Sequence, residues 1–305
     1  MGWFSDNEFL IQAALAVSLL AYSFQVAMRS GVFSLAGAGF WGIGGYTTAY
    51  LVDHGWRTLP AIVAALAASF VIAVILALVL GRLRALYLGM ASVAFVLLVQ
   101  IAAVNWEGFT GGAAGLFAIP VTITTWELAA LVIAVSIGLV FFERGARGRR
   151  IEALRIDEQL AQSLGVDAKR ERMHVFVFSS LLGCLSGCVS AMMFNTLAPE
   201  QVGFALIASV LMMVVIGGTS AWWGALVGAF VVTWLPEVFR FADEWRLVLQ
   251  GALVIAVVVW APEGIVGGVR KLRSLVTRRG VRPAATLGGA TVEDVVAHEP
   301  EESVV

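Results

Sequence analysis

Cys184 and Cys188 are the residues in this sequence whose type and spacing most suggest a reactive pair. Four residues apart on a helix, they would share one face, so their thiols could meet a soft metal ion or each other. A disulfide within one helical turn has poor geometry, and two thiols alone make a weak metal site. We therefore expect both to be small buried residues at a helix contact, and we predict no metal site.

The remaining chemistry-bearing residues do not form a catalytic pattern. A phosphate-binding P-loop needs Gly directly before Lys, whereas Lys169 follows Ala168 and Lys271 follows Arg270. No nucleophile elbow of the G-x-S-x-G type occurs, and no His, Cys or carboxylate cluster has metal-ligand spacing. The histidines lie at loops or segment ends: His54, His174 and His298. The sequence predicts no catalytic residue and no bound cofactor, so any ATP hydrolysis would belong to another subunit.

Composition shows which solvent surrounds the elements that carry these residues. Of the 305 residues, 60% are hydrophobic and 13% are charged, whereas a soluble domain carries about 25% charged residues. Such a chain needs lipid as well as water around it. The net charge of −1 gives no strong attraction to nucleic acid. We predict an all-α, polytopic transmembrane helix bundle.

The apolar segments set the number of spans. A hydrocarbon core of ~30 Å needs roughly 20 apolar residues per helix, and the chain has room for roughly 8–10 spans, the shorter of which could be broken or re-entrant. The first segment lacks signal-peptide features and is expected to stay in the membrane. The candidates are Phe9–Met28, Leu35–Val52, Pro60–Leu80, Leu86–Val104, Val121–Phe142, Val175–Asn195, Phe204–Gly218, Trp222–Trp234 and Leu247–Trp260.

The positions of the Lys and Arg residues orient the predicted spans in the membrane. If the loop 143–172 is cytoplasmic, then of the 20 Lys and Arg residues only Arg57, Arg240 and Arg246 fall outside, as the positive-inside rule requires. We therefore expect a multi-pass cell (inner) membrane protein with its N-terminus outside and its C-terminus cytoplasmic. Tryptophans near the span ends agree with an interfacial aromatic belt. They are Trp56, Trp106, Trp126, Trp245 and Trp260.

Two regions follow from the same patterns. We expect residues 1–268 to form the transmembrane domain, which includes the loop 143–172, and residues 269–305 to form a tail that is first basic and then acidic. The tail mixes Gly, Ala and Thr with acidic residues, which is typical of a solvated, disordered extension without chemistry of its own.

The loop 143–172 contains the most informative polar stretch. Ile151, Leu154, Ala161 and Leu164 recur at helical spacing, which predicts one amphipathic helix over Ile151–Val166. Gly165 is a natural stop. The helix is too short and too charged to span a membrane. It could rest on the lipid surface or dock into a groove on a cytoplasmic partner, and periodicity does not decide between them.

Glycines form a second signal. Gly31, Gly37, Gly39, Gly42, Gly44 and Gly45 crowd one segment, and Gly183 with Gly187, and Gly224 with Gly228, are spaced by four. Small faces let helices approach closely in lipid. The alternative is a deformable or broken helix that lines a cavity. Thr110-Gly111-Gly112 is expected to be a turn.

From about Gly31 to Gly264, the chain resembles the LivM-type permease of branched-chain amino acid ABC importers. Ser34–Tyr46 is similar to the early glycine-rich segment of that family, and Asn105-Trp106 with Thr110-Gly111-Gly112 and Pro120 is similar to its external loop. Ala153–Arg155 through Ala161–Gly165 resembles its cytoplasmic EAA-type loop. Later matches are Pro199-Glu200, Met213–Gly218, Trp223-Gly224 and Pro262-Glu263-Gly264.

The resemblance implies partners. An extracytoplasmic solute-binding protein would deliver solute, a second identical or homologous permease would complete the pathway, and two cytoplasmic ATPase subunits would carry ATP and Mg. It also favours partner docking over a lipid-resting helix for the loop 143–172. The implied coupling residues are Leu154, Asp157, Glu158, Leu160, Ala161, Leu164 and Gly165.

The pathway residues rest partly on polarity. Thr47, Gln100, Asn105 and Asn195 are polar groups in or beside apolar spans, where they either line the pathway or bridge helices. The resemblance adds Gly42, Gly44, Thr110, Gly111, Gly112 and Glu200, with an outward opening near Thr110–Gly112 and Pro199-Glu200.

Departures from the family leave the solute open. The family often has an acid where this chain has Leu97 and Arg where it has Gln100, and its EAA-type loop commonly has Ala and Glu where Gln162 and Ser163 stand. Branched-chain or other hydrophobic amino acids are expected as the solute, with urea, amides or aromatic acids as alternatives.

A self-sufficient carrier or channel and a structural membrane scaffold are the competing classes of protein. Few ionisable groups lie in the spans, which argues against a proton relay, although backbone carbonyls could still coordinate sodium.

Overall fold

The computed structural model describes residues 7–81, 83, 85–117, 123–219, 221–238, 251, 255 and 264–267. These residues belong to one compact unit, Met1–Gly268. The longer elements are α2 (Glu8–Arg29), α3 (Gly37–Asp53), α4 (Thr58–Leu80), α5 (Ala85–Asn105), α7 (Thr125–Arg144), α8 (Ala146–Ile156), α10 (Ala168–Phe194), α11 (Phe204–Gly217) and α12 (Gly224–Val238). The short ones are α6 (Glu107–Thr110), η1 (Gly112–Ala114), β1 (Leu116–Phe117), α9 (Glu158–Ser163), β2 (Thr196–Leu197) and η2 (Pro199–Gln201).

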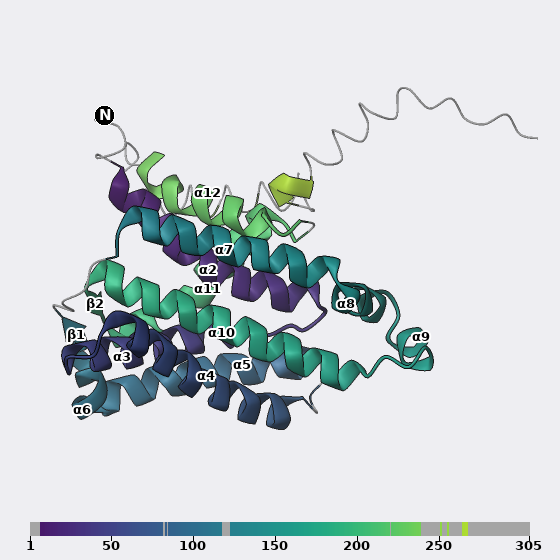
Figure 1. Cartoon of the computed structure of the whole chain (residues 1–305), viewed down its shortest axis with the longest axis horizontal. Helices are drawn as coiled ribbons and strands as arrows, with labels where there is room; N and C mark the ends of the chain where they lie inside the picture. The colour runs from purple at the N-terminus through teal and green to yellow at the C-terminus, as the bar shows by residue number, and fades with distance from the viewer. Residues whose placement is uncertain are drawn as a thin grey trace, which may run out of the picture. The chain divides into compact units, whose positions relative to one another are not determined.

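Each predicted span from Phe9 to Trp234 corresponds to a helix, which confirms the all-α bundle (Figure 1). Among the described residues, α2, α4, α5, α7 and α10 are long and apolar enough to cross a membrane. Helix α11 is apolar but has 14 residues, or about 21 Å at 1.5 Å per residue, which is less than a bilayer core. Helix α12 is apolar as well, and the described residues include 15 of it, up to Val238. The predicted span Leu247–Trp260 lies almost wholly outside the described residues, as does the tail 269–305.

Two predicted spans, α7 and α10, start several residues away from the observed helix, and α10 begins at Ala168 rather than Val175. Helix α7 begins at Thr125 rather than Val121, because the side chain of Thr124 accepts a hydrogen bond from the Glu127 amide. The Glu127 carboxylate in turn accepts one from the Thr124 amide at 3.0 Å. This reciprocal pair is a capping box, which satisfies two backbone donors at the start of the helix.

Helices α3 and α10 pack backbone to backbone. A Cβ added to Gly187 would lie 1.9 Å from the carbonyl oxygen of Trp41, and one added to Gly44 would lie 2.3 Å from that of Cys184. Gly183 meets Gly37 in the same way. Helix α3 is continuous from Gly37 to Asp53, so these glycines allow close helix packing. A break within α3 is therefore wrong, and the alternative of a deformable helix stays a prediction.

The cysteines lie in this α3–α10 contact, as expected. Both are buried, their sulfur atoms are 4.0 Å apart, and the Cys188 thiol donates to the carbonyl oxygen of Gly44 at 3.5 Å. They are therefore small residues at a helix contact.

Helix α2 is held in the bundle by short polar side chains. The hydroxyl of Ser23 donates to the carbonyl oxygen of Ser179 at 2.7 Å, and that of Ser186 donates to Ala16 at 2.9 Å. The hydroxyls of Tyr22 and Ser136 are 2.9 Å apart. In lipid, where helix association gains little from apolar burial, such hydrogen bonds help to join helices.

Helix α4 covers one side of the bundle with a single face. Its buried residues are spaced by four: Ala61, Ala65, Ser69, Ala73 and Ala77. Its other face carries exposed apolar side chains such as Leu59, Val63 and Phe70, which suits contact with lipid. Trp56, Trp106 and Trp126 are also exposed near helix ends, in agreement with the predicted aromatic belt.

The loop elements collect at the two ends of the bundle. Helices α8 and α9 lie at one end, while α6, β1 and β2 lie at the other (Figure 1). Strands β1 and β2 pair antiparallel, with Leu116 opposite Leu197 and Phe117 opposite Thr196. Helix α10 runs between these ends, so it connects the segment after α9 directly to β2.

Candidate functional site

The segment predicted to be one helix over Ile151–Val166 is divided in two. Helix α8 ends at Ile156, Asp157 is extended with φ −150° and ψ 110°, and α9 starts at Glu158. The prediction of a continuous helix is therefore wrong at Asp157. The stop at Gly165 is confirmed, because Gly165 has φ +85° and the Val166 amide donates to the carbonyl oxygen of Ala161 at 3.0 Å. A positive φ of this size favours glycine.

Among the side chains that the structure describes in this segment, Leu164 is the large apolar one that is exposed. Leu164 is 74% exposed, whereas Ala161, one turn earlier, is 1% exposed and Ile151 is buried. Leu154 is half-buried on α8, and Asp157 and Gly165 are exposed. Glu158 and Leu160 lie on α9, and their side chains are outside the described set. The predicted coupling residues thus share a compact protrusion with Leu164 at its surface.

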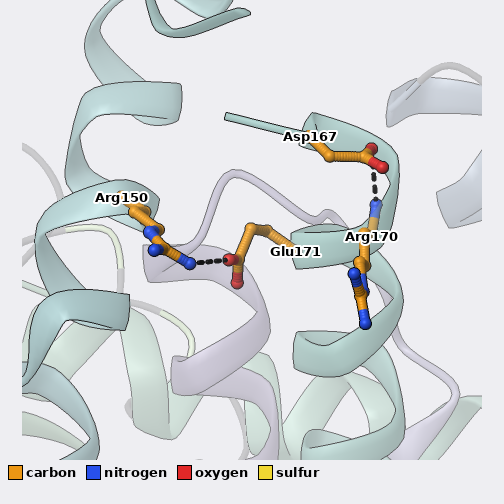
Figure 2. A network of polar contacts seen from close by, with 4 residues as sticks. All are labelled: Arg150, Asp167, Arg170 and Glu171. Atoms are coloured by element: carbon orange, nitrogen blue, oxygen red, sulfur yellow. Dashed lines mark hydrogen bonds and ion pairs between the residues drawn. The ribbon is translucent and has the colours of Figure 1, made fainter. Parts of the chain in front are cut away.

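Polar contacts fix this protrusion to the start of α10. The guanidinium of Arg150 on α8 lies 3.4 Å from a carboxylate oxygen of Glu171, which is itself buried (Figure 2). The carboxylate of Asp167 accepts a hydrogen bond from the Arg170 amide at 3.1 Å and so caps α10. The Arg150–Glu171 pair joins α8 to α10 across α9, while the Asp167 cap acts within α10 itself.

At the opposite end, Thr110 organises a tight turn, as predicted. Its hydroxyl hydrogen is shared between the carbonyl oxygens of Ala103 at 2.5 Å and Trp106 at 2.7 Å, and its oxygen accepts from the Gly112 amide at 3.3 Å. Gly111 has φ +75°, and a Cβ there would lie 2.2 Å from the carbonyl oxygen of Gly115. Only glycine fits this turn without strain.

The turn meets the segment that follows α10. The β1–β2 pair joins the two chain segments, and η1 contacts η2. On α5, Gln100 lies against Gly203, since a Cβ on Gly203 would be 3.1 Å from either terminal atom of the Gln100 amide. On α3, a Cβ on Gly42 would lie 2.9 Å from a methyl carbon of Val202. Of the predicted pathway residues, Gly42 and Gln100 thus lie against the residues that directly follow η2.

Other predicted pathway residues lie elsewhere. Gly44 faces Cys184 in the α3–α10 contact. The Asn105 amide donates to the carbonyl oxygen of Ile101 on its own helix at 2.7 Å and is exposed. Asn195 ends α10 with φ +53°, Thr47 is half-buried on α3, and Glu200 is exposed on η2.

Gln25 is a polar contact that the sequence reasoning did not single out. Its side chain is 2% exposed, and its amide nitrogen donates to the carbonyl oxygens of Ala221 at 2.6 Å and Gly218 at 3.3 Å. Its amide oxygen accepts from the Ala225 amide at 3.3 Å. Gln25 therefore ties α2 to the turn between α11 and α12. The available signal was an amide inside the first apolar segment, the same signal that drew attention to Gln100.

Apolar helices with a polar protrusion at one end and a closed loop cluster at the other define a multi-pass membrane protein of the permease type. The chain belongs to the family described as branched-chain amino acid transport system / permease component, which it matches over residues 8–258.

Three relatives indicate the range of this similarity. The chain is 28% identical over 275 residues to the high-affinity branched-chain amino acid transport system permease protein LivM of Escherichia coli (strain K12), covering 77% of this chain and 64% of LivM. It is 31% identical over 143 residues to the autoinducer 2 import system permease protein LsrC of Klebsiella pneumoniae, covering 44% and 40%. It is 24% identical over 131 residues to the xylose transport system permease protein XylH of E. coli, covering 40% and 33%. No solved structure matches the chain.

Proposed function

We propose that this chain is the membrane-spanning permease subunit of an ABC importer in the cell (inner) membrane. It would work with an extracytoplasmic solute-binding protein, a second identical or homologous permease and two cytoplasmic ATPase subunits that carry ATP and Mg. The observation that carries the proposal is the anchored protrusion α8–α9, which exposes Leu164 beside a membrane bundle of a permease family. The sequence has no P-loop, so the energy source is external.

In this proposal α9 is the coupling element. A short helix with an exposed leucine suits insertion into a hydrophobic groove on a partner. Asp157 and Glu158 would pair with basic residues at the rim of that groove, where an exposed ion pair contributes only about 0–1 kcal/mol. Burial of Leu164 would therefore dominate docking. This side of the bundle is the cytoplasmic side in the proposed orientation, with the N-terminus outside and the C-terminus inside.

The proposed pathway runs along the exposed face of α5. Leu97, Gln100 and Ile101 share that face because they are spaced by three and four residues. Leu97 is 40% and Ile101 is 63% exposed, and Gln100 lies against Gly203. One amide in an apolar wall suits a solute with a hydrophobic side chain and a hydrogen-bonding group. Branched-chain or other hydrophobic amino acids fit this description, and LivM, named for branched-chain amino acid transport, is a relative.

The decisive experiment reconstitutes the full chain in proteoliposomes with and without its ATPase and binding-protein partners. We expect leucine uptake only when the partners and ATP are present, with urea and an aromatic acid as comparison solutes. Uptake by the chain alone, without nucleotide, would refute the ABC assignment and favour a self-sufficient carrier or channel. ATP-dependent uptake of urea or the aromatic acid in place of leucine would keep the importer and correct its solute.

A further inference from the structure

The face of α3 that meets α5 carries two glycines and one tyrosine. Gly39, Gly42 and Tyr46 are spaced by three and four residues, so they share one side of the helix. A Cβ added to Gly39 would lie 2.7 Å from the ring of Phe95 and 3.5 Å from the Cα atom of Val96, both on α5. Tyr46 therefore lies on the side of α3 that packs against α5, in the seam between the two helices.

The α3–α5 seam continues beyond Tyr46 in both directions. One turn before it, a Cβ on Gly42 would lie 2.9 Å from a methyl carbon of Val202. One turn after it, the ring of Tyr50 packs on the ring of Phe109 in α6, with centroids 4.7 Å apart. Tyr46 therefore lies between the connection that follows η2 and the loop cluster that contains α6.

The Tyr46 hydroxyl is buried without a hydrogen-bond partner. The residue is 2% exposed, and its oxygen makes no hydrogen bond to any residue that the structure describes. A buried tyrosine hydroxyl usually has a partner, because an unpaired polar group in apolar surroundings costs free energy. Tyr22 on α2 shows the usual arrangement, since its hydroxyl is 2.9 Å from that of Ser136. The unpaired Tyr46 hydroxyl therefore requires an explanation.

Two other unpaired hydroxyls have a local explanation. Those of Thr48 on α3 and Ser69 on α4 are also buried without a hydrogen-bond partner. Thr48 lies beside the thiol of Cys188, and Ser69 lies beside that of Cys184. A thiol is a weak donor and a weak acceptor, so each of these hydroxyls has a weak partner. For Tyr46 the surroundings contribute burial alone.

A second polar group lies close to the same connection. The Gln100 amide on α5 lies against Gly203, and Gly42 on α3 lies against Val202. These two residues, Val202 and Gly203, are the whole connection between η2 and α11. Helices α3 and α5 therefore both contact it, and Tyr46 is one turn from that contact. If the connection moved away from α3, an apolar wall and the Tyr46 hydroxyl would be uncovered together.

We propose that the Tyr46 hydroxyl donates a hydrogen bond to the carboxylate of the transported solute when Val202 and Gly203 move away from α3. The inference rests on the proposed importer function and adds a contact residue to its pathway. A phenol hydroxyl is a donor, and a carboxylate is an acceptor only. Val99 and Val202 would contact the apolar side chain of the solute. The hydroxyl stays unpaired in the closed seam, and the solute supplies its partner.

The test compares two tyrosines in the full importer complex, reconstituted in proteoliposomes. ATP-driven uptake is measured at saturating leucine, aromatic acid or urea, and the thermal midpoint of the detergent-solubilised chain is measured in parallel. Tyr46→Phe should lower uptake of the transported acid roughly three- to tenfold, since one hydrogen bond made during passage is lost. Its thermal midpoint should be unchanged or raised, because the removed hydroxyl has no partner.

Tyr22→Phe is the matched control and should do the reverse. It loses a buried hydrogen bond to Ser136, so its thermal midpoint should fall. Its uptake per folded complex should equal that of the unmodified complex, because Tyr22 joins α2 to α7 away from the α3–α5 seam.

The outcomes separate this inference from the function on which it rests. Equal uptake by Tyr46→Phe and the unmodified complex would overturn the inference and leave the importer standing. A lower thermal midpoint of Tyr46→Phe would also overturn it, because the hydroxyl would then have a structural partner. Uptake of urea alone would exclude the carboxylate contact, since urea has no carboxylate. No ATP-driven uptake of any solute by the unmodified complex would refute the importer and this inference together.

Discussion

Truncation of Leu164 gives the sharpest test of coupling, because its side chain is 74% exposed and directly follows α9. Leu164→Ala removes apolar surface that only a partner could cover. Surface substitutions of this kind change folding stability by about 0.5 kcal/mol or less. Any larger effect must therefore come from the assembled complex.

The size of the effect follows from the exposed area. Fully burying a leucine side chain is worth about 1.5–3 kcal/mol. About three quarters of Leu164 remains to be buried on docking, given its 74% exposure, so truncation should weaken ATPase binding by about 1–2 kcal/mol. That corresponds to about a 5- to 30-fold rise in Kd.

The assay measures the affinity of the detergent-solubilised chain for its purified ATPase subunit, followed by solute-stimulated ATP turnover after reconstitution. Phe117→Ala is the matched control, since Phe117 is 64% exposed but lies on β1 at the opposite end of the bundle. The control should bind the ATPase with unchanged affinity. An unchanged Kd for Leu164→Ala, or an equal loss in both variants, would show that α9 is not the docking element.

Three further changes probe other parts of the structure. Gly187→Ala should lower the free energy of unfolding of the detergent-solubilised chain by about 1–3 kcal/mol, because its Cβ would lie 1.9 Å from the Trp41 carbonyl oxygen. Gly138→Ala, whose added Cβ would meet nothing within 4 Å, should be neutral or stabilising. Gln25→Leu should cost about 1–3 kcal/mol in the same measurement, because it removes the side-chain partner of the buried Gly218 carbonyl and Ala225 amide, whereas the Ala221 carbonyl keeps the Gly224 amide. Full stability would refute that role. Gln100→Leu should change the rate or solute spectrum of uptake and leave ATPase affinity unchanged; unaltered uptake would place the pathway elsewhere.

Hydropathy was sufficient to find the bundle, because each helix in lipid must satisfy its own backbone hydrogen bonds and so needs a long apolar run. The break between α8 and α9 at Asp157 has no comparable signal in the sequence. Leu154 and Ala161 keep the same helical register on either side of it, so the apolar pattern is continuous although the backbone is not. A single extended residue that preserves register cannot be seen from periodicity.

Contacts between segments far apart in the chain also could not be predicted from the sequence. The pairing of Leu116 with Leu197 involves two-residue strands, which have no detectable alternation. By contrast, the Gly165 stop and the Thr110-Gly111-Gly112 turn were predictable, because positive φ angles select glycine locally. Of the candidate pathway residues, Gln100 and Gly42 approach η2, but only the fold could separate them from Gly44, which faces α10.

The glycine contact between α3 and α10 has a mechanical consequence. Where the two backbones touch, no side chain lies between them whose rotamer could absorb a displacement, so we expect α3 and α10 to move together. Helix α10 has 27 residues, a length of about 40 Å, and it starts a few residues after α9 and ends one residue before β2. If α9 is the coupling element proposed above, a displacement of α9 would be transmitted along α10 to the far loop cluster. Helix α10 is continuous from Ala168 to Phe194, so no break in the helix would absorb that displacement.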